Sequence, residues 1–319
     1  MPQPSLAPGV PAAMADLAEQ VPAWHGQDLR ISPLSGGITN RNYKVEAGGQ
    51  SYVLRLGGAN THLLGIDRHT EYAAALAAAA IQAGPEVLHF IAPQGYLVTH
   101  FITGRNLPPA EMRQPGIIRQ VAGLLRRVHS LPPIPGSFSA FQVVRDYRRA
   151  AADHGAACCP PETDWLFEAA GRIERAVAQT APPACPCHND LLNENFLLET
   201  HSGELRLLDW EYAGMGDLTF DLANLSAQHD FGPVEDQALL QAYFGDDASP
   251  RYARLQLMKI MSDFREAMWG ALQSAISALD FDFQSYATRY FGRVSAGMND
   301  PNFNRWLDES GRGDHIVAE

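Results

Sequence analysis

The sequence predicts an α+β protein of two lobes, a small lobe built on an antiparallel sheet and a larger, mostly helical lobe. Residues 29–56 form short strand-like runs separated by paired glycines, a pattern typical of antiparallel hairpins. The later part of the chain carries apolar residues at helical spacing over long stretches. The 319 residues suffice for two domains. We expect an N-terminal extension over 1–28, a first lobe over 29–103 and a second lobe over 104–319.

The first lobe is expected to combine a hairpin, one helix and two further strands. Gly48 and Gly49 make the hairpin turn before the strand-like run at 51–56. An alanine-rich helix is predicted over 67–82, because acidic residues starting with Asp67 lie in its first turn. Two more strands are predicted at 85–90 and 95–101, and the lobes are expected to divide near 101–106.

Several segments of the second lobe carry apolar residues at the spacing of a helix. These predicted helices span 115–130, 165–179, 234–244, 251–279 and 283–298. An exception lies between residues 187 and 210, where two short apolar runs flank the turn at 201–203. That pattern predicts a small β-hairpin within an otherwise helical lobe.

Composition and charge narrow the classes of partner. Apolar residues make up 46% and charged residues 19% of the sequence, which is typical of a globular protein. The sequence contains no apolar run of about 18 residues and no basic leader, so we expect no membrane span and a cytoplasmic location. The net charge of −12 disfavours nucleic acid as a partner and attracts a small cation. The oligomeric state stays open, and a homodimer is compatible with the sequence.

The cysteines form two close groups, Cys158 with Cys159 and Cys185 with Cys187. His188 follows the second group, which raises the question of a zinc site. A zinc knuckle usually separates its cysteines by two residues, and neither group has that spacer. We therefore expect these cysteines to be small buried thiols.

The strongest functional pattern is the ordered set His188-Asn-Asp190, Asn195 and Asp209. Phosphoryl transfer requires that a hydroxyl is oriented and that charge on a triphosphate is neutralised. We expect Asp190 to accept or orient the hydroxyl, and Asn195 and Asp209 to hold Mg²⁺ through oxygen atoms. Each residue alone could cap a loop, but the set in this order is typical of kinases. His188 is expected to be a structural hydrogen-bonding group beneath the loop.

A glycine-containing loop in the first lobe fits the same chemistry. It joins two predicted strands and contains Gly36, Gly37, Thr39 and Asn40. Glycines let backbone amides approach a phosphate closely. Arg55 on the following strand and Glu71 on the following helix stand where a kinase places its phosphate-binding cation and the acid that holds it. We expect the loop and this pair to bind the nucleotide together.

With these motifs the chain resembles the choline/ethanolamine kinase branch of the aminoglycoside-phosphotransferase-like kinases, over roughly residues 30–295. In that branch an arginine is usual at the strand position of Arg55. The resemblance implies a two-lobed protein-kinase-like fold, with ATP and Mg²⁺ as cofactors. It also implies that backbone groups near His100 and Ile102 hold the adenine. The residues expected by the same resemblance to brace the catalytic loop are Asp217, Asp221 and Asn224.

The resemblance also suggests the acceptor, through residues that lie where the family has its choline cage. These residues are Tyr212, Glu266, Trp269 and Tyr286. A quaternary ammonium donates no hydrogen bonds and is held best against aromatic faces. Glu266 and Trp269 are three residues apart, so a helix presents both on one face. In animal relatives a second tryptophan stands at the position of Glu266, so a primary or partly methylated amine also fits. Ordinary core positions are the alternative for Trp269 and Tyr286.

The function implied by the resemblance is the phosphorylation of choline, or a related small cationic amino alcohol, to give phosphocholine. Ethanolamine, thiamine or an aminoglycoside is the alternative acceptor, because kinases of this fold share their catalytic residues. A protein kinase is disfavoured, since the segment between Glu211 and Asp221 leaves no room for an activation segment. A kinase-like module that binds a ligand without turnover is the remaining alternative, and the intact Asp190, Asn195 and Asp209 argue against it.

Overall fold

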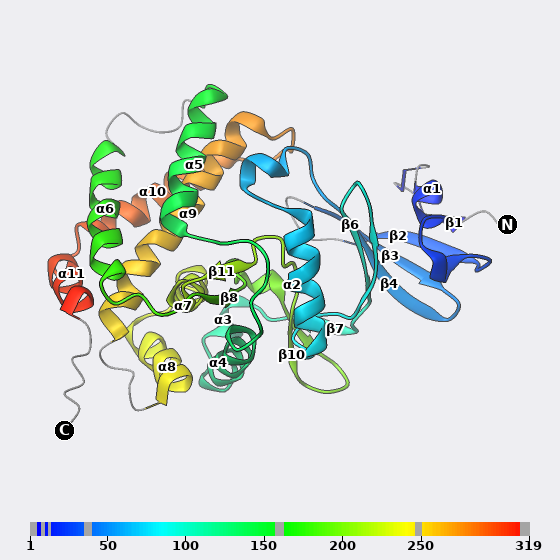
Figure 1. Ribbon diagram of the computed structural model, residues 1–319, viewed down its shortest axis with the longest axis horizontal. Coiled ribbons are helices and arrows are strands. Elements are labelled where there is room, and N and C mark those ends of the chain that lie inside the picture. The colour runs from blue at the N-terminus through cyan, green and yellow to red at the C-terminus, as the bar shows by residue number, and fades with distance from the viewer. Residues whose placement is uncertain are drawn as a thin grey trace. The chain divides into compact units, whose positions relative to one another are not determined.

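The structure is a computed structural model that describes residues 5–7, 10–11, 14–34, 40–156, 163–245 and 251–312. The chain divides into two compact units. The first unit comprises Met1–His62, Ile66–Leu107 and Glu194–Glu211, and the second comprises Leu63–Gly65, Pro108–Asn193 and Tyr212–Glu319. Figure 1 labels the helices and strands of both units.

A mixed sheet forms the centre of the first unit. Its strands are β1 (Ser5–Leu6), β2 (Leu29–Leu34), β3 (Arg41–Ala47), β4 (Gln50–Leu56), β5 (Val87–Ile91) and β6 (Tyr96–His100), in the spatial order β1-β2-β3-β4-β6-β5. Neighbouring strands are antiparallel except β1 and β2, which run parallel. Gly48 and Gly49 take positive φ angles of 56° and 80°, as a two-residue hairpin turn requires. The predicted hairpin therefore lies where the glycines indicate.

The N-terminal segment belongs to the core of this unit. Met14 and Ala18 of helix α1 (Met14–Ala18) are buried with Trp24, whose ring lies 5.7 Å from that of Tyr52 on β4. Full burial of a side chain the size of methionine contributes about 1.5–3 kcal/mol to folding. The sequence interpretation placed 1–28 outside the lobe, and these contacts correct it, because the apolar side chains of this segment are buried against the sheet.

Helix α2 (Arg68–Ala80) begins at the predicted acidic residue. The Asp67 side chain accepts a hydrogen bond from the Thr70 amide at 2.7 Å, which satisfies one of the amides that a helix start leaves unpaired. Tyr72 of this helix stacks on Phe90 of β5 with ring centroids 4.7 Å apart. Glu71 in the first turn is buried. The helix therefore delivers a carboxylate to the interior of the first unit.

A second sheet in the first unit contains the predicted hairpin. Its strands are β7 (Gly104–Asn106), β9 (Phe196–Glu199) and β10 (Leu205–Leu207), in the antiparallel order β10-β9-β7. A Cβ atom added at Gly104 would lie 2.5 Å from the Leu198 carbonyl oxygen, so the close approach of β7 to β9 requires glycine. This pairing groups 194–211 with the first unit, whereas the sequence interpretation placed that segment in the second lobe.

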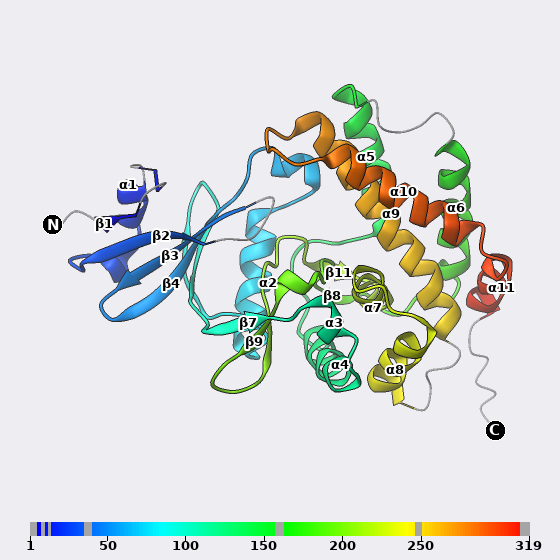
Figure 2. The ribbon, with the colours of Figure 1, turned by 180° about the vertical axis from the view of Figure 1, so that it is seen from behind.

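The second unit is mostly helical. Its helices are α3 (Pro109–Met112), α4 (Pro115–His129), α5 (Ala140–Asp153), α6 (Asp164–Ala178), α7 (Leu218–Gln228), α8 (Pro233–Phe244), α9 (Tyr252–Ile276), α10 (Phe283–Met298) and α11 (Phe303–Arg312). Two short strands, β8 (Cys185–Cys187) and β11 (Gly214–Gly216), pair antiparallel. Helix α9 contacts α5, α7, α10 and α11, and Figure 2 shows α10 lying along it. Helix α9 is therefore the central helix of this unit.

Each helix predicted in the second lobe corresponds to an observed helix, and the predicted and observed ends agree to within one helical turn. Helices α3, α5, α7 and α11 were not predicted. In the part of the chain that the structure describes, every helix is too short or too polar to cross a membrane.

Candidate active site

The predicted catalytic loop follows β8 in the second unit and is held by α7. The Asp221 carboxylate, which is 0% exposed, accepts hydrogen bonds from the amides of His188 at 2.8 Å and Asn189 at 2.7 Å. Asn224, one turn along α7, accepts from the Leu191 amide at 2.6 Å. Asn189 takes a left-handed φ of 66°, which is unfavourable for a non-glycine residue. These contacts agree with the expectation that Asp221 and Asn224 brace the loop.

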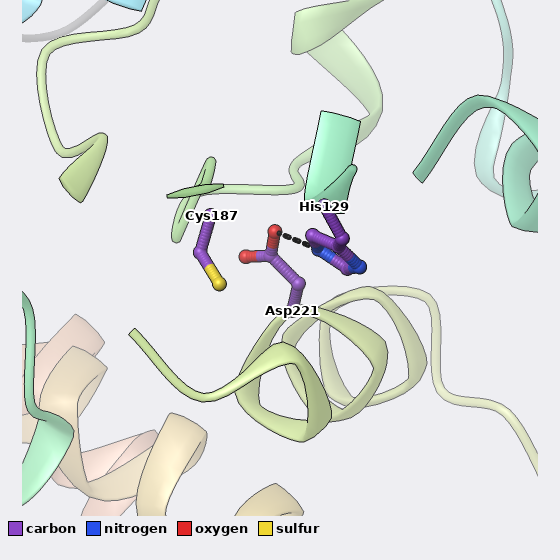
Figure 3. A group of neighbouring side chains, drawn as sticks. All are labelled: His129, Cys187 and Asp221. Carbon is purple, nitrogen blue, oxygen red and sulfur yellow. Dashed lines mark hydrogen bonds and ion pairs between the residues drawn. The ribbon is translucent and has the colours of Figure 1, made fainter. Parts of the chain in front are cut away.

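His129, Cys187 and Asp221 form a buried cluster of metal-ligand residue types beneath the loop, shown in Figure 3. His129 Nε2 lies 3.0 Å from Asp221 Oδ2, and His129 Nδ1 lies 2.6 Å from the Tyr243 hydroxyl. Burial opposes the charge of Asp221, but its interactions with His129 first and then with His188 outweigh burial and lower the pKa of its carboxyl. Both carboxylate oxygens of Asp221 accept hydrogen bonds from backbone amides of the loop. We therefore interpret the cluster as a support of the loop.

Of the two cysteines of β8, Cys187 fits the expectation of a buried thiol, whereas Cys185 is only partly buried. The Cys185 and Cys187 sulfur atoms are 4.0 Å apart, and Cys187 is buried. The hydrogen bond with Cys185 and then burial raise the pKa of the Cys187 thiol. Its thiol is therefore stabilised in the protonated form. Cys158 and Cys159 lie outside the described residues.

Asp190, the predicted catalytic residue, is contacted by a buried arginine. Both terminal nitrogens of Arg265 on α9 lie 3.3 Å from Asp190 Oδ1, and one of them also donates to the Asn189 carbonyl at 2.9 Å. The Arg265 side chain is 2% exposed. The sequence patterns did not single out Arg265, since an arginine among the apolar residues of a helix carries no signal of its partner.

Arg55 and Glu71, predicted to act together, form an ion pair in the first unit. Arg55 NH1 also donates to Asp209 Oδ1 at 2.8 Å. Strand β4, helix α2 and the segment after β10 thus bring together a predicted phosphate cation, its acid and a predicted metal ligand. Both Arg55 and Glu71 are largely removed from water, which strengthens the attraction between opposite charges.

A second cation and a third acid complete this charged cluster. Arg68 at the start of α2 contacts Glu71 at 2.7 Å and Glu211 at 3.0 Å. The Asn40 amide donates to Glu211 at 2.9 Å and to Asp209 at 3.4 Å. Burial and then the neighbouring charge of Asp209 raise the pKa of the Glu211 carboxyl. Asn40 was predicted at this site, whereas Arg68 and Glu211 were missed.

The predicted metal ligands Asn195 and Asp209 both belong to this first unit. The Leu208 amide donates to the Asn195 carbonyl at 2.9 Å, which ties Asn195 to the residue before Asp209. Asp209 has a left-handed φ of 61° and a side chain that is 25% exposed. Together with Glu71 and Glu211 it makes three carboxylates against two guanidinium groups, a surplus of one negative charge. Oxygen donors and surplus negative charge fit Mg²⁺.

Three predicted substrate residues meet on α9 and α10 in the second unit. The Trp269 ring, 7% exposed, makes edge contacts with the rings of Tyr286 at 5.5 Å and Phe283 at 5.6 Å. The Tyr286 hydroxyl donates to Glu266 Oε2 at 2.7 Å, and Glu266 Oε1 forms an ion pair with Arg265 at 3.0 Å. Burial and then the charge of Glu266 raise the pKa of Tyr286, so its hydroxyl stays a donor.

Tyr212, the fourth predicted substrate residue, lies against Arg265. The guanidinium carbon is 4.5 Å from the centre of the Tyr212 ring, within the range of a cation–π contact. Tyr212 is buried, and its carbonyl accepts from the Asn189 side chain at 3.0 Å. This tyrosine is therefore placed at the catalytic loop.

The remaining nucleotide residues are placed only in part. Gly36, Gly37 and Thr39 lie outside the described residues. His100 ends β6, and its amide donates to the Glu86 carbonyl at 2.8 Å. The next amide, of Phe101, donates to the Ser51 carbonyl at 2.9 Å. The backbone amides of His100 and Phe101 are therefore used within the sheet. In the predicted adenine-binding stretch, we expect the backbone of Ile102 to contact the adenine.

Comparison with known proteins identifies the family of this chain. Residues 30–257 match the phosphotransferase enzyme family. A choline/ethanolamine kinase family protein from Mesorhizobium loti is 31% identical, with a TM-score of 0.79 over 94% of this chain and 99% of that chain. This chain belongs to the choline/ethanolamine kinase family of phosphotransferases. Human ethanolamine kinase 2 is 26% identical to it over 311 residues, which cover 89% of this chain and 80% of that protein.

The fold of the choline/ethanolamine kinase family also extends to more distant structures. The choline kinase LicA from Streptococcus pneumoniae aligns with a TM-score of 0.73 at 23% identity, covering 84% of this chain and 94% of that chain. The predicted α+β class and protein-kinase-like fold are confirmed. The predicted enzyme class, an ATP-dependent phosphotransferase with an alcohol group as acceptor, is confirmed as well. The roles of single residues stay predictions.

Proposed function

We propose that the enzyme transfers the γ-phosphate of ATP to the hydroxyl of choline and releases phosphocholine. The observation that carries this proposal is the aromatic group in which Trp269 contacts Tyr286 and Phe283. The faces of such rings attract a quaternary ammonium by about 0.5–2 kcal/mol, depending on desolvation. The relatives carry the names of choline and ethanolamine kinases, which supports an amino alcohol as the acceptor.

Ethanolamine is the second candidate, because a carboxylate lies beside these rings. A primary ammonium donates charge-assisted hydrogen bonds to a carboxylate, whereas the ammonium of choline has no proton to donate. Both oxygens of Glu266 are engaged, however, by Arg265 and by the Tyr286 hydroxyl. That arrangement leaves the aromatic faces as the main attraction for the cation and favours choline.

In the proposed reaction, the hydroxyl oxygen of choline bonds to the γ-phosphorus. The bond from that phosphorus to the oxygen bridging the β-phosphate breaks, and ADP leaves with the electron pair. Asp190 orients the hydroxyl and takes its proton, a contribution of about 100-fold or more to the rate. Arg55 adds positive charge at the triphosphate, and its ion pair with Glu71 keeps the guanidinium in place.

Mg²⁺ is the proposed metal, with Asn195 and Asp209 as the residues that would hold it. Carboxylate and amide oxygens are the donors that this hard cation prefers. When bound, Mg²⁺ neutralises charge on the triphosphate. The loop with Gly36 and Gly37 is proposed to contact the phosphates, and the backbone of Ile102 to contact the adenine. A cytoplasmic location, the lack of a nucleic-acid partner and a homodimer remain predictions.

A panel assay of ATP consumption tests the proposed function. Purified protein is supplied with ATP, Mg²⁺ and one acceptor at a time, namely choline, ethanolamine, thiamine or an aminoglycoside. We expect kcat/KM to be highest for choline and at least tenfold lower for thiamine and the aminoglycoside. A preference for the aminoglycoside or thiamine would overturn the proposal. Nucleotide binding without turnover of any acceptor would identify a non-catalytic module.

A further inference from the structure

Arg265 connects the predicted catalytic residue to the predicted substrate pocket. It contacts Asp190 with both terminal nitrogens and pairs with Glu266 on the other side. We infer that Arg265 is a positioning residue for Asp190, and that Glu266 serves the reaction through Arg265 instead of binding the substrate cation. The inference rests on the proposed function, because it takes Asp190 as the residue that orients the acceptor hydroxyl.

The catalytic loop is held from two sides, and Arg265 supplies one of them. Asp221 accepts the amide hydrogens of His188 and Asn189, which fixes the start of the loop. Arg265 holds the Asn189 carbonyl and the Asp190 carboxylate. The left-handed φ of Asn189 lies in a sparsely populated region that persists only where neighbouring groups hold it. Without Arg265 the direction of the Asp190 carboxylate is no longer set from the α9 side.

Charge balance explains why Glu266 is part of this arrangement. A buried guanidinium is costly unless opposite charges surround it. Burial by itself would lower the pKa of Arg265, but Glu266 first and then Asp190 outweigh it and raise that pKa well above its usual range. Glu266 is itself only 4% exposed. A Glu266 carboxylate turned towards a substrate cation would leave Arg265 with a single carboxylate partner.

The hydroxyl of Tyr286 extends the same chain of contacts into the aromatic group. It donates to Glu266, which pairs with Arg265, which in turn contacts Asp190. This series of contacts therefore begins at Tyr286, whose ring contacts Trp269, and ends at the carboxylate of Asp190. Loss of the Glu266 charge should therefore slow the transfer step by the same factor for a primary and for a quaternary amine.

A double-mutant cycle on Asp190→Asn and Arg265→Gln tests the inference. Arg265→Gln should lower kcat about 10- to 100-fold, the range expected for a misplaced catalytic group, with KM for ATP changed less than threefold. A residue that acts only through Asp190 adds no further loss once Asp190 is neutral. We therefore expect the double variant to be within threefold of Asp190→Asn alone. Losses that multiply would overturn the positioning role.

The matched control is Arg254→Gln on the same helix. Arg254 is also buried and ion-paired, to Asp217, and donates to the Val177 carbonyl at 2.6 Å. Any loss from Arg254→Gln should multiply with that of Asp190→Asn, because Arg254 is held by Asp217 and the Val177 carbonyl and would not act through Asp190. Glu266→Gln supplies the second arm, with kcat for choline and for ethanolamine lowered by factors that agree within threefold. A loss confined to ethanolamine would show that Glu266 binds the ammonium.

Folding and the acceptor are separated from the inference by two further measurements. If Arg265→Gln does not fold, as judged by its Tm, Arg265→Lys replaces it, because an ammonium keeps the charge but lacks the planar fork that reaches several oxygens at once. The lysine variant should also lose at least fivefold in kcat, and only when Asp190 is intact. The same cycle is run on the slow hydrolysis of ATP by water, so the inference is judged even if every amino alcohol is rejected.

Discussion

Arg55 donates to the Oδ1 atom of Asp209 at 2.8 Å, although 154 residues separate the two in the chain. Arg55 is the cation predicted for phosphate, and Asp209 is the carboxylate predicted for the metal. The two charges therefore partner each other within the first unit. Because they share this contact, a change at either residue alters the charge that the triphosphate meets.

Substitution of Arg55 by lysine should raise the KM for ATP by about tenfold and leave the KM for choline nearly unchanged. Arg55 engages Glu71 and Asp209 together, and an ammonium cannot reproduce the planar fork that makes both contacts. Steady-state kinetics at saturating choline measure the effect. Arg145→Lys is the control, because Arg145 forms an exposed ion pair with Glu174. Unchanged KM values in Arg55→Lys and Arg55→Ala would place the phosphate cation elsewhere.

Substitution of Asp209 by asparagine should raise the Mg²⁺ concentration for half-maximal activity by more than tenfold. Asparagine keeps an oxygen donor but removes the charge that holds a divalent cation. Calorimetric titration of the Mg²⁺–nucleotide complex into each protein should show the same effect as weaker binding to Asp209→Asn. Asp153→Asn, at an exposed position of α5, is the control. Equal Mg²⁺ dependence in the two variants would contradict the assignment of Asp209.

Local patterns in the sequence predicted many of the helices and strands. Helix α2 starts at its capping Asp67, and the β3–β4 hairpin turns at Gly48 and Gly49, because these residues act on their own backbone. Helix α7 was missed for the opposite reason. Its residues from Thr219 to Ala227 are all buried, so the helix has no solvent-exposed polar face to set against a buried apolar one.

The site divides in the same way. Motif spacing in the sequence was enough to propose Asp190, Asn195 and Asp209 as site residues. Arg68 contacts Glu211 across 143 residues, and Arg265 contacts Asp190 across 75. Such pairs depend on how distant elements pack, and no local pattern in one sequence encodes them.

The carboxyl of Asp263 should make stability fall as the pH rises from about 4 to about 6. Burial raises the pKa of Asp263 from its usual 3.8 to about 6, although Arg293 at 2.9 Å opposes the change. Between these values the folded protein holds a proton that the unfolded chain releases, so the free energy of unfolding falls with rising pH by up to about 3 kcal/mol. Above pH 6 this contribution is constant.

Chemical denaturation of the wild type and of Asp263→Asn at several pH values measures this effect. Asparagine does not titrate, so the difference in unfolding free energy between the two proteins should change between pH 4 and pH 6 and stay level above it. Asp153→Asn again serves as the exposed control. A difference that is constant from pH 4 to pH 7 would show that Asp263 titrates alike in both states.

Substitution of Trp269 by leucine should raise the KM for choline more than tenfold. Leucine keeps apolar bulk but loses the aromatic face, and the cation–π attraction together with lost packing amounts to about 1.5–3 kcal/mol. Kinetics with choline as the varied substrate measure the effect, and Trp165→Leu is the control, because Trp165 is 41% exposed on α6. If choline and ethanolamine kinetics are untouched by Trp269→Leu, the aromatic pocket is elsewhere.

Phosphorus NMR of the reaction products tests whether the enzyme phosphorylates choline with the help of Asp190. Wild type and Asp190→Asn are each incubated with ATP, Mg²⁺ and choline, and the fate of the γ-phosphate is followed. We predict that the wild type converts the γ-phosphate signal into phosphocholine with equal release of ADP, while Asp190→Asn binds ATP with nearly unchanged affinity and turns over at least about 100-fold more slowly. Release of inorganic phosphate alone by the wild type would contradict choline kinase activity, and an Asp190→Asn variant that retains more than about a tenth of the wild-type kcat would contradict the role of Asp190.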